Sequence, residues 1–527
     1  MAKIITAQEA AKLIPDHCTV GFGGQGLAGW PEEISLAIRD SFAATGHPCD
    51  LNVKHGCTLG NWGKKGLTHL GEAGPGLVTR WCGAHVGSIF ALRALAAENK
   101  LQLHCLPQGV IVNLWREIAA GRPGLITKVG LGTFVDPRNG GGKINEAATD
   151  ELVELIHFQG EEYLFYKSFP LHVAIIRGTI ADENGNITME DESFINEAYH
   201  VACAAKNSGG ITIAQVKTIA KKGTLHPKDV VVPGVLVDYI VQCTDPENHW
   251  QTEGVYLEPA FSGSVKKPLR AIPVMPFDEK KVLCRRCAME LKRGYILNLG
   301  VGIPADLSKV VNEEGYLDFI STSTEVGNFG GVASALPNFG ATYNAEASVE
   351  HGNMFDFIDG GGLDMTCLGI GEIDEEGNNN VSYLGDTVMG PGGFIDISQN
   401  TPKIVFCGTF MDKAKIEIKD GKVHILEQGK RRKFVKKVKQ ITFAGKYARD
   451  DQNILYVTER CVFRLVDKRL TLVEIAPGID LGRDILANMD FKPAIADNLK
   501  LMDPEIFQEH WGGLGKYLDT GTYARPE

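Results

Sequence analysis

The order of features along this chain is repeated, and the repeat strongly constrains the fold. Residues 8–40 give a helix, a strand, a Gly-rich turn, a proline and a helix, and residues 286–314 give the same series. Both turns lead into a helix expected to begin at a proline, Pro31 or Pro304, where the missing N–H costs nothing. Apolar runs of strand length alternate with amphipathic runs of helix length. The sequence therefore predicts an α/β fold class, with two homologous open α/β domains produced by a tandem duplication.

A second matched pair of segments sets the register of the duplication. Residues 173–190 and 367–383 share the series D-E-x-G-N between apolar runs. Because Gly and Asn tolerate positive φ, the series predicts a hairpin turn in each half, without chemistry. With 527 residues, the chain is too long for one core. We predict domains at 1–242 and 279–527, joined by a connector at 243–278 that is rich in Pro and Gly.

The balance of charge argues against several classes of partner. The chain has 54 Lys and Arg against 65 Asp and Glu, a net charge of −11, with no long single-sign tail. A mildly acidic surface disfavours nucleic acid. No apolar stretch approaches the roughly 20 residues of a membrane helix, and the first residues lack the pattern of a signal peptide. We therefore expect a cytoplasmic protein that binds neither nucleic acid nor membrane.

The cysteines do not predict a metal site. There are 12 in the chain, and the only close pair is Cys284 and Cys287. Metal binding at this pair would require a second pair, or histidines at ligand spacing, and none follows. We interpret the pair as part of a helix and predict no metal.

Glycine is abundant, with 61 residues, and the Gly-rich turns leave two interpretations open. The segment Gly21–Gly26 matches the dinucleotide signature G-x-G-x-x-G, but Asp50 precedes the next apolar run instead of ending it. The matching turn, 300–304, also lacks the last glycine. Dinucleotide binding therefore stays a minor alternative. Otherwise such a turn is either a tight strand-to-helix connection or a source of N–H groups for an anion or an oxyanion.

One acidic side chain, Glu325, lies in the stretch 320–331, which otherwise contains small residues, hydroxyls and glycines. It follows the apolar run at 316–320. Taken alone, such a carboxylate is best explained as a helix cap or a solvated turn. The alternative is a nucleophile on a loop, and the rest of the chain has to decide between them.

A series of longer motifs resembles a known family. The segments are PQGVI (107–111), KVGLGTFVDPR (128–138), STEVGNFGG (323–331), FDFIDGGGLDMTCLG (355–369), GPGGFIDIS (390–398) and LTLVEIAPGIDLGRDIL (470–486). In this order they resemble the single-chain CoA-transferases of the acetate/propionate type, class I of the 3-oxoacid CoA-transferase superfamily. The resemblance covers nearly the whole chain. It implies the CoA-transferase type of duplicated α/β fold.

The resemblance also implies roles for individual residues. Glu325 matches the glutamate that attacks acyl-CoA, although Val326 follows it where other members often have Ser, a departure that bears on acyl selectivity. By family position, Val301 and Gly302, together with Gly392 and Gly393, would form the oxyanion and CoA loops. Gln108 resembles a glutamine near the substrate, but it could equally be a turn amide.

Two further features have a structural explanation as well as a functional one. His85 is better explained as a packed or supporting histidine, so it is left out of the chemistry. The basic run Lys430–Lys439 could meet the phosphates of CoA, although a solvated strand face explains it better.

A carboxylate nucleophile explains why no general base is needed, because Glu is ionised at neutral pH. We expect ping-pong transfer of CoA between short-chain acyl-CoA and a free short-chain carboxylic acid, through an acyl-glutamyl anhydride and a glutamyl-CoA thioester. Coenzyme A is then a substrate and covalent intermediate, with no tightly bound cofactor. A homodimer or homotetramer is expected. An acyl-CoA hydrolase remains the main alternative, and a non-catalytic CoA-binding module would not need Glu325.

Overall fold

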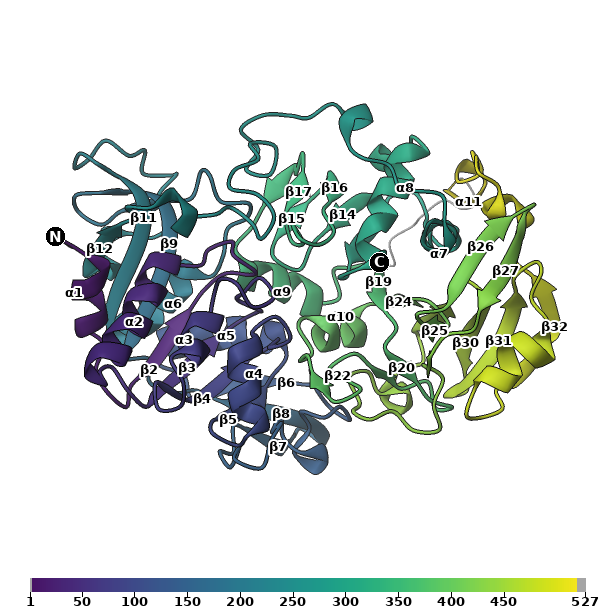
Figure 1. The fold of residues 1–527 in the computed structure, drawn as a ribbon, viewed down its shortest axis with the longest axis horizontal. Helices are drawn as coiled ribbons and strands as arrows, with labels where there is room; N and C mark the ends of the chain where they lie inside the picture. The colour runs from purple at the N-terminus through teal and green to yellow at the C-terminus, as the bar shows by residue number, and fades with distance from the viewer. Residues whose placement is uncertain (1, 519–527) are drawn as a thin grey trace. The chain divides into compact units, whose positions relative to one another are not determined.

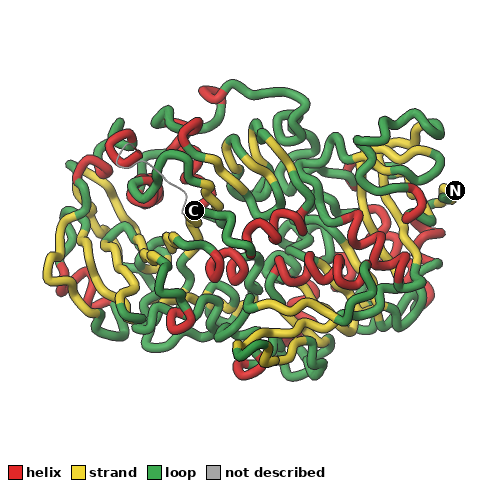
Figure 2. Tube along the Cα trace, turned by 180° about the vertical axis from the view of Figure 1, so that it is seen from behind, coloured by secondary structure: helices red, strands yellow, loops and turns green. Residues whose placement is uncertain are grey.

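The computed structural model describes residues 2–518, which divide into two compact units (Figures 1 and 2). Unit 1 comprises residues up to 265, with 348–356 and 387–396. Unit 2 comprises 266–347, 357–386 and the chain from 397 onward. The first part of the expected connector thus belongs to unit 1, as do two segments of the second half of the sequence. The boundaries 1–242 and 279–527 remain a prediction about the duplication.

Unit 1 is built on an open sheet whose eight main strands all run parallel to their neighbours. Strand β9 is buried along nearly its whole length, which explains its almost continuous apolar sequence. A short strand, β10 (Ile187–Thr188), pairs antiparallel with β9. The sheet order is β1 (Lys3–Ile5), β12 (Tyr239–Gln242), β11 (Ile211–Ala220), β9 (Val173–Asp182), β2 (Thr19–Phe22), β3 (Leu51–His55), β4 (Val78–Gly83) and β5 (Gln102–Cys105).

The helices of unit 1 form two groups (Figure 1). One continuous layer contains α1 (Ala7–Lys12), α2 (Glu32–Thr45), α3 (Thr68–Glu72) and α4 (Phe90–Ala97), whereas α5 (Gln108–Ala119) and α6 (Ala198–Asn207) pack against each other. Helix α2 begins at Glu32, one residue after the predicted start, with Pro31 as its N-cap, and it ends at Gly46, whose φ of 76° allows a left-handed cap. A separate antiparallel sheet contains β6 (Gly124–Thr127), β8 (Glu161–Lys167) and β7 (Val153–Phe158).

Unit 2 is built on a mixed sheet whose central strands, from β14 to β29, are parallel. Strands β15 and β30 are antiparallel to their neighbours β14 and β29. A short strand, β18 (Ala347–Ser348), ends the sheet beside β15. The remaining order is β15 (Asn328–Phe329), β14 (Ser321–Ser323), β13 (Ile296–Leu299), β19 (Met365–Gly369), β24 (Lys403–Cys407), β29 (Asn453–Val457), β30 (Cys461–Val466), β31 (Arg469–Ile475) and β32 (Ala494–Leu501).

The other elements of the second half of the chain are short. The second Gly-rich turn leads first into a 3-10 turn at Ile303–Asp306, which contains Pro304, and only then into α8. The helices are α7 (Glu279–Ala288), α8 (Leu307–Glu313), α9 (His351–Asp359), α10 (Phe394–Asn400) and α11 (Gly515–Leu518). The small strands are β16 (Val332–Ala333), β17 (Thr342–Tyr343), β20 (Glu372–Ile373), β21 (Asn379–Asn380), β22 (Tyr383–Leu384), β23 (Thr387–Val388), β25 (Met411–Asp412), β26 (Lys415–Lys419), β27 (Lys422–Glu427) and β28 (Arg431–Arg432). Within residues 2–518, no helix is both long and apolar enough to span a bilayer.

The D-E-x-G-N segments form the predicted hairpin turns, and their internal bonds are the same in both units. Asp182 Oδ1 accepts the N–H groups of the residues two and four positions later, at 2.9 and 3.0 Å. Asp374 Oδ1 accepts the equivalent pair, both at 3.1 Å. The glycine has positive φ in each turn, 92° at Gly185 and 74° at Gly377. With the shared order of elements, these turns confirm the predicted fold class of two homologous open α/β domains.

The predicted helix around Cys284 and Cys287 is confirmed as α7, and its buried face lies in the core of unit 2. There Cys287 lies close to Cys367 of β19 and Cys407 of β24, with all three sulfur atoms within 4.8 Å of one another. Sequence spacing could not reveal this group, because its members come from three separate elements.

A cluster of charges at the C-terminal end of α7 should make the protein sensitive to acid. Glu290 pairs with Arg286 at 2.9 Å and with Lys403 at 2.7 Å. Burial alone would raise the pKa of Glu290, but these two cations outweigh it and lower the pKa to about 2. Because the pKa is lower in the folded state, the stabilisation is fully present above about pH 4.5 and is lost as pH falls toward 2.

We therefore expect the free energy of unfolding to fall by about 3 kcal/mol across this range through Glu290 alone. Urea denaturation at a series of pH values measures it. Glu290→Gln should flatten that part of the profile. If Glu290→Gln shows the same dependence of the unfolding free energy on pH as the wild type, Glu290 is not the group responsible.

Candidate active site

In both units the Gly-rich turn follows a strand from which the next strands of the sequence extend in opposite directions across the sheet. From β2 of unit 1, β3 to β5 extend on one side and β9, β11 and β12 on the other. In unit 2, β14 lies on one side of β13, and β19, β24 and β29 lie on the other. Ligands of open α/β sheets bind at the carboxyl ends of strands at such a point. The candidate residues are therefore expected at these edges.

Glu325 lies at this edge of unit 2, on the tight turn between β14 and β15. Thr324 N–H donates to Asn328 O at 3.0 Å, and Gly327 N–H donates to Thr324 O at 3.0 Å. Gly327 has φ 112°, a conformation that glycine adopts without strain. The loop is also tied to Gly340 O by Asn328 Nδ2 at 3.2 Å. The turn thus holds Glu325 on a short, internally bonded backbone.

The surroundings of Glu325 exclude its simplest structural explanations. The residue is only 6% exposed, so it is not a solvated turn residue. Strands lie on both sides of it and no helix begins there, so it is not a helix cap. Glu325 is thus a buried acid on a glycine-rich turn at the carboxyl edge of the sheet, where ligands of such sheets bind.

The backbone of the neighbouring Gly-rich turn can supply hydrogen-bond donors. Asn298 of β13 is in register with Ser323 of β14, so the turn after β13 and the turn carrying Glu325 leave adjacent strands. Among residues 2–518, the N–H groups of Val301 and Gly302 donate to no protein acceptor. A Cβ at Gly302 would meet nothing within 4 Å, so this backbone faces open space. It is suited to hold a developing negative charge.

Asn298 is a polar group of this edge that the sequence analysis did not single out. It is fully buried, and its Oδ1 accepts a hydrogen bond from Thr366 Oγ1 at 3.2 Å. Its Nδ2 has no partner within the described part of the chain. A buried amide donor without a protein partner is costly, and a ligand or an ordered water commonly supplies the missing acceptor. The signal was present in the sequence, as the one polar residue in the apolar strand ILNL.

Gln108 belongs to unit 1 and is fully buried at the start of α5. It is not simply a turn amide, because its side chain forms part of a polar cluster. Gln108 Nε2 lies 2.8 Å from His351 Nε2, and His351 Nδ1 lies 2.8 Å from Glu197 Oε2. All three residues are 0% exposed. His351 and Glu197 were not predicted, since no local pattern links positions 108, 197 and 351.

This polar cluster lies against the Gly-rich turns of unit 1. A Cβ at Gly23, after β2, would lie 3.5 Å from Glu197 Cγ. A Cβ at Gly56, after β3, would lie 2.8 Å from Glu197 Oε1. The cluster is therefore located at the carboxyl edge of the sheet, where β2 and β3 end.

The loop at 390–393 also reaches Gln108, within unit 1. Gly392 O accepts the backbone N–H of Gln108 at 3.0 Å, and Gly392 N–H donates to Ala84 O at 2.9 Å. Both polar backbone groups of Gly392 are thus used internally. Gly393 N–H donates to no acceptor among residues 2–518. Of this predicted pair, only Gly393 has a donor available for a ligand.

The Gly-rich turn after β2 is stabilised by a buried ion pair. Arg177 binds Glu192 with two hydrogen bonds, at 2.9 and 2.5 Å, and both side chains are at most 3% exposed. Arg177 Nη1 also donates to Leu27 O, Trp30 O and Trp250 O, at 2.9 to 3.1 Å. Burial alone would raise the pKa of Glu192, but Arg177 outweighs it and holds the pKa well below its usual range. The buried guanidinium of Arg177 therefore holds the backbone that follows this turn by hydrogen bonds to its carbonyl groups.

The dinucleotide alternative receives no support from Asp50. This residue precedes β3 and accepts hydrogen bonds from His17 and Thr79. It therefore does not lie at the carboxyl end of a strand, where a ribose would be bound.

His85 is a partly buried histidine, and several side chains of the basic run form ion pairs, in line with the structural explanations given for both. Desolvation lowers the pKa of His85 to about 4, so it is neutral at pH 7. In the run Lys430–Lys439, Arg431 and Lys433 pair with Asp412, Arg432 pairs with Asp490, and Lys439 pairs with Asp386. Four of the seven basic residues of the run are therefore paired with acids of the same unit.

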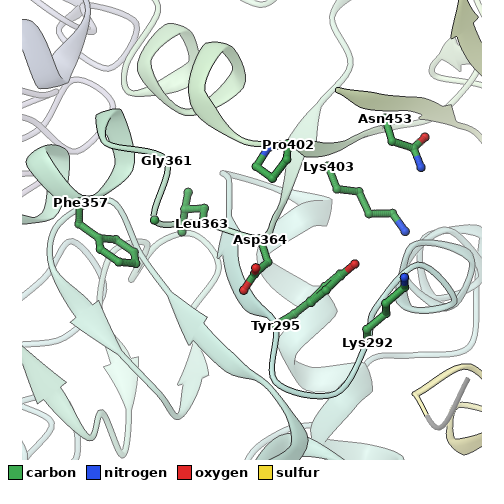
Figure 3. A pocket seen from close by; sticks show the side chains of 10 residues that line it. Lys292, Tyr295, Phe357, Gly361, Leu363, Asp364, Pro402, Lys403 and Asn453 are labelled. Atoms are coloured by element: carbon green, nitrogen blue, oxygen red, sulfur yellow. The ribbon is translucent and has the colours of Figure 1, made fainter. Parts of the chain in front are cut away.

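A cavity of about 530 Å³ in unit 2 lies at the opposite edge of the sheet (Figure 3). Tyr295 lines it just before β13, Asp364 just before β19, and Lys403 begins β24. It therefore opens at the amino ends of these strands, whereas Glu325 follows a carboxyl end. Size alone does not make this cavity the active site.

Comparisons with known proteins agree with this geometry. A profile of the family described as "Coenzyme A transferase" matches residues 4–243. The chain is 60% identical to caffeate CoA-transferase of Acetobacterium woodii over 98% of this chain and 99% of that protein. It is 39% identical to the acetate CoA-transferase YdiF of Escherichia coli K12, over 96% of this chain and 95% of that protein.

Solved structures show the same fold. The crystal structure of the YdiF apoenzyme from Escherichia coli O157:H7 superposes with a TM-score of 0.91, at 38% identity and 97% coverage of both chains. A second structure of that protein, with a TM-score of 0.90, is described as a thioester complex with CoA. The resemblance inferred from the motifs is thus confirmed over almost the whole length. The chain belongs to the coenzyme A transferase family, in the form that carries both homologous halves on a single polypeptide.

Proposed function

We propose that this CoA-transferase moves CoA between a short-chain acyl-CoA and a free carboxylic acid, with Glu325 as the covalent nucleophile. The observation that carries the proposal is the position of Glu325. It is a 6% exposed carboxylate on a tight turn, next to a turn with available N–H groups at the carboxyl edge of the sheet. Such a carboxylate needs no general base, because it is already ionised near neutral pH.

The reaction proceeds by four balanced displacements. Glu325 attacks the thioester carbonyl, and CoA leaves as the thiolate, which gives an acyl-glutamyl anhydride. The thiolate attacks the glutamyl carbonyl and displaces the first acid as its carboxylate, so that Glu325 carries CoA as a thioester. The second acid attacks this thioester, CoA leaves, and a new anhydride forms. The thiolate then attacks the new acyl carbonyl, which releases the new acyl-CoA and restores Glu325.

Each attack places negative charge on a carbonyl oxygen. The N–H groups of Val301 and Gly302 are the proposed donors beside Glu325, and removal of one such donor typically costs about 2.7–4 kcal/mol of transition-state stabilisation. Gly393 N–H remains a proposed donor for CoA or substrate, whereas Gly392 holds Gln108 in place. Gln108 is the proposed substrate-binding amide of unit 1. No step requires a metal or a redox cofactor.

Two observations bear on which carboxylic acids accept CoA, and they favour different acids. The motifs resemble acetate and propionate enzymes, whereas a relative at 60% identity is named caffeate CoA-transferase. A methylene in an apolar pocket changes binding by only about 1–3 kcal/mol, so both groups of acids have to be measured. The informative panel is acetate, propionate, butyrate, lactate and caffeate as acceptors, each with the acyl-CoA of a different acid as donor.

Incubation with acetyl-CoA alone should leave a glutamyl-CoA thioester on the peptide that contains Glu325. The label is detected by mass spectrometry after borohydride reduction or trapping with hydroxylamine. Initial-rate plots against both substrates should give parallel lines, since donor and acceptor react in turn. A label on another acid, or intersecting lines, would overturn the proposed mechanism.

A hydrolase would use the same loops but would let water attack the intermediate. Release of free CoA without an acceptor acid, followed with a thiol reagent, separates the two reactions. We expect slow release without acceptor and rapid acyl transfer with it, because Glu325 is shielded from bulk water. We also propose a homodimer or homotetramer, which light scattering measures directly.

A further inference from the structure

The buried cluster of Gln108, His351 and Glu197 is more specific than packing requires. Each side chain comes from the start of a different helix. Gln108 is the first residue of α5, His351 is the first residue of α9, and Glu197 directly precedes α6. Each is fully buried, and they are joined in a row by two contacts of 2.8 Å. Burying three polar side chains is costly, and an apolar cluster of the same shape would cost less.

The row determines which ring nitrogen of His351 carries the proton. A carboxylate can only accept, so the contact with Glu197 places the proton of His351 on Nδ1. In a neutral His351 the other nitrogen, Nε2, then has a lone pair and accepts from Gln108 Nε2, which lies 2.8 Å away. Because the amide donates on this side, its oxygen has to face the other way.

This orientation leaves Gln108 Oε1 as an acceptor without a protein partner. Within residues 2–518 neither Gln108 Oε1 nor Glu197 Oε1 has a hydrogen-bond partner, although both are buried. A Cβ at Gly392 would lie 3.8 Å from Gln108 Oε1, so this glycine leaves room beside the oxygen. A buried carbonyl oxygen without a donor costs about 1–3 kcal/mol, unless a ligand supplies the donor.

We infer that Glu197 and His351 are positioning residues that orient the amide of Gln108, so that its oxygen receives an N–H or O–H donor of the substrate. The inference rests on the proposed function, in which Gln108 binds the substrate. Two parts of the substrates carry such donors. One is the pantetheine arm of CoA, with its amide N–H and hydroxyl groups, and the other is a hydroxyl group on the acyl chain.

The first test measures the protonation of His351 in the wild-type enzyme. With ¹⁵N-labelled histidine, NMR distinguishes protonated from unprotonated ring nitrogens, and the signal of His351 is assigned by its loss in His351→Gln. We expect a proton on Nδ1 and none on Nε2. A proton on Nε2 overturns the inference, and this result does not depend on the transferase activity.

The second test uses matched substitutions at position 197. Glu197→Leu removes the acceptor for His351, and we expect KM to rise about 10-fold with little change in kcat. Glu197→Gln retains an accepting oxygen and should recover most of that loss. Gln108→Leu should raise KM by a similar factor. In the double variant with Glu197→Leu the two effects should not add, because residue 197 acts only through Gln108.

Two substrate pairs identify the source of the donor. A rise in KM for acetyl-CoA with propionate as acceptor indicates the pantetheine arm. A rise for 3-hydroxybutyrate but not for butyrate indicates a hydroxyl group on the acyl chain. An unchanged KM in both pairs, or full additivity in the double variant, contradicts the inference. The label on Glu325 should persist in Glu197→Leu, which separates this inference from the nucleophile assignment.

Discussion

Replacement of Glu325 with glutamine should lower the transferase rate by at least about 1,000-fold, because a neutral amide is a poor nucleophile and the covalent route is lost. The fold and the affinity for CoA should change little, since the residue lies on a turn and its side chain is not part of the hydrophobic core. Steady-state rates with acetyl-CoA, together with the loss of the covalent label, measure the effect.

Glu346→Gln provides a matched control for this substitution. Glu346 is an exposed acid of the same unit, about 20 positions further along the chain. The same change of charge there should leave the rate within about 2-fold of wild type. Normal turnover in Glu325→Gln would show that the buried acid has a structural role and that another residue forms the intermediate.

Substitution of Arg177 with methionine should destabilise unit 1 by about 3–5 kcal/mol, because it leaves the buried carboxylate of Glu192 without its cation. It also removes three hydrogen bonds to the backbone carbonyls of residues 27, 30 and 250. Urea denaturation, followed by circular dichroism, measures the loss. The additional substitution Glu192→Leu should recover part of it, since no unpaired charge then remains.

Lys217→Met is the control for the loss of a cation near the same site. Lys217 pairs with Asp191 at 3.0 Å, but both side chains are partly exposed to solvent. Surface pairs of this kind contribute about 1 kcal/mol or less. Equal losses in the two variants would show that burial of Arg177 has no special effect on the Gly-rich turn.

The sequence predicted the parts of this structure that depend on local pattern. The alternation of strands and helices, the helix after Pro31 and the hairpins at 182–186 and 374–378 all follow from periodicity and turn chemistry. Glu325 was found because a lone acid in a glycine-rich stretch is unusual, and the resemblance to a family then gave it a role. The same resemblance named Gln108 without its partners.

What the sequence could not predict depends on contacts between distant positions. Glu197 and His351 occupy ordinary helix starts, and only the fold brings them to Gln108. Gly392 was predicted as a possible donor, but its N–H is bonded to Ala84, which the glycine cluster itself does not indicate. The group of Cys287 with Cys367 and Cys407 is likewise formed by three separate elements.

The assignment of segments 348–356 and 387–396 to unit 1 has a consequence for synthesis on the ribosome. His351 and the glycine loop that holds Gln108 are translated long after residue 265. Domains generally fold as they emerge, the N-terminal one first. Here the first unit cannot be completed until about residue 396 has left the ribosome, when much of the second unit has also been made. Until then the N-terminal unit of the nascent chain lacks these two segments, and truncation in the connector should yield a fragment in which Gln108 lacks its partner imidazole.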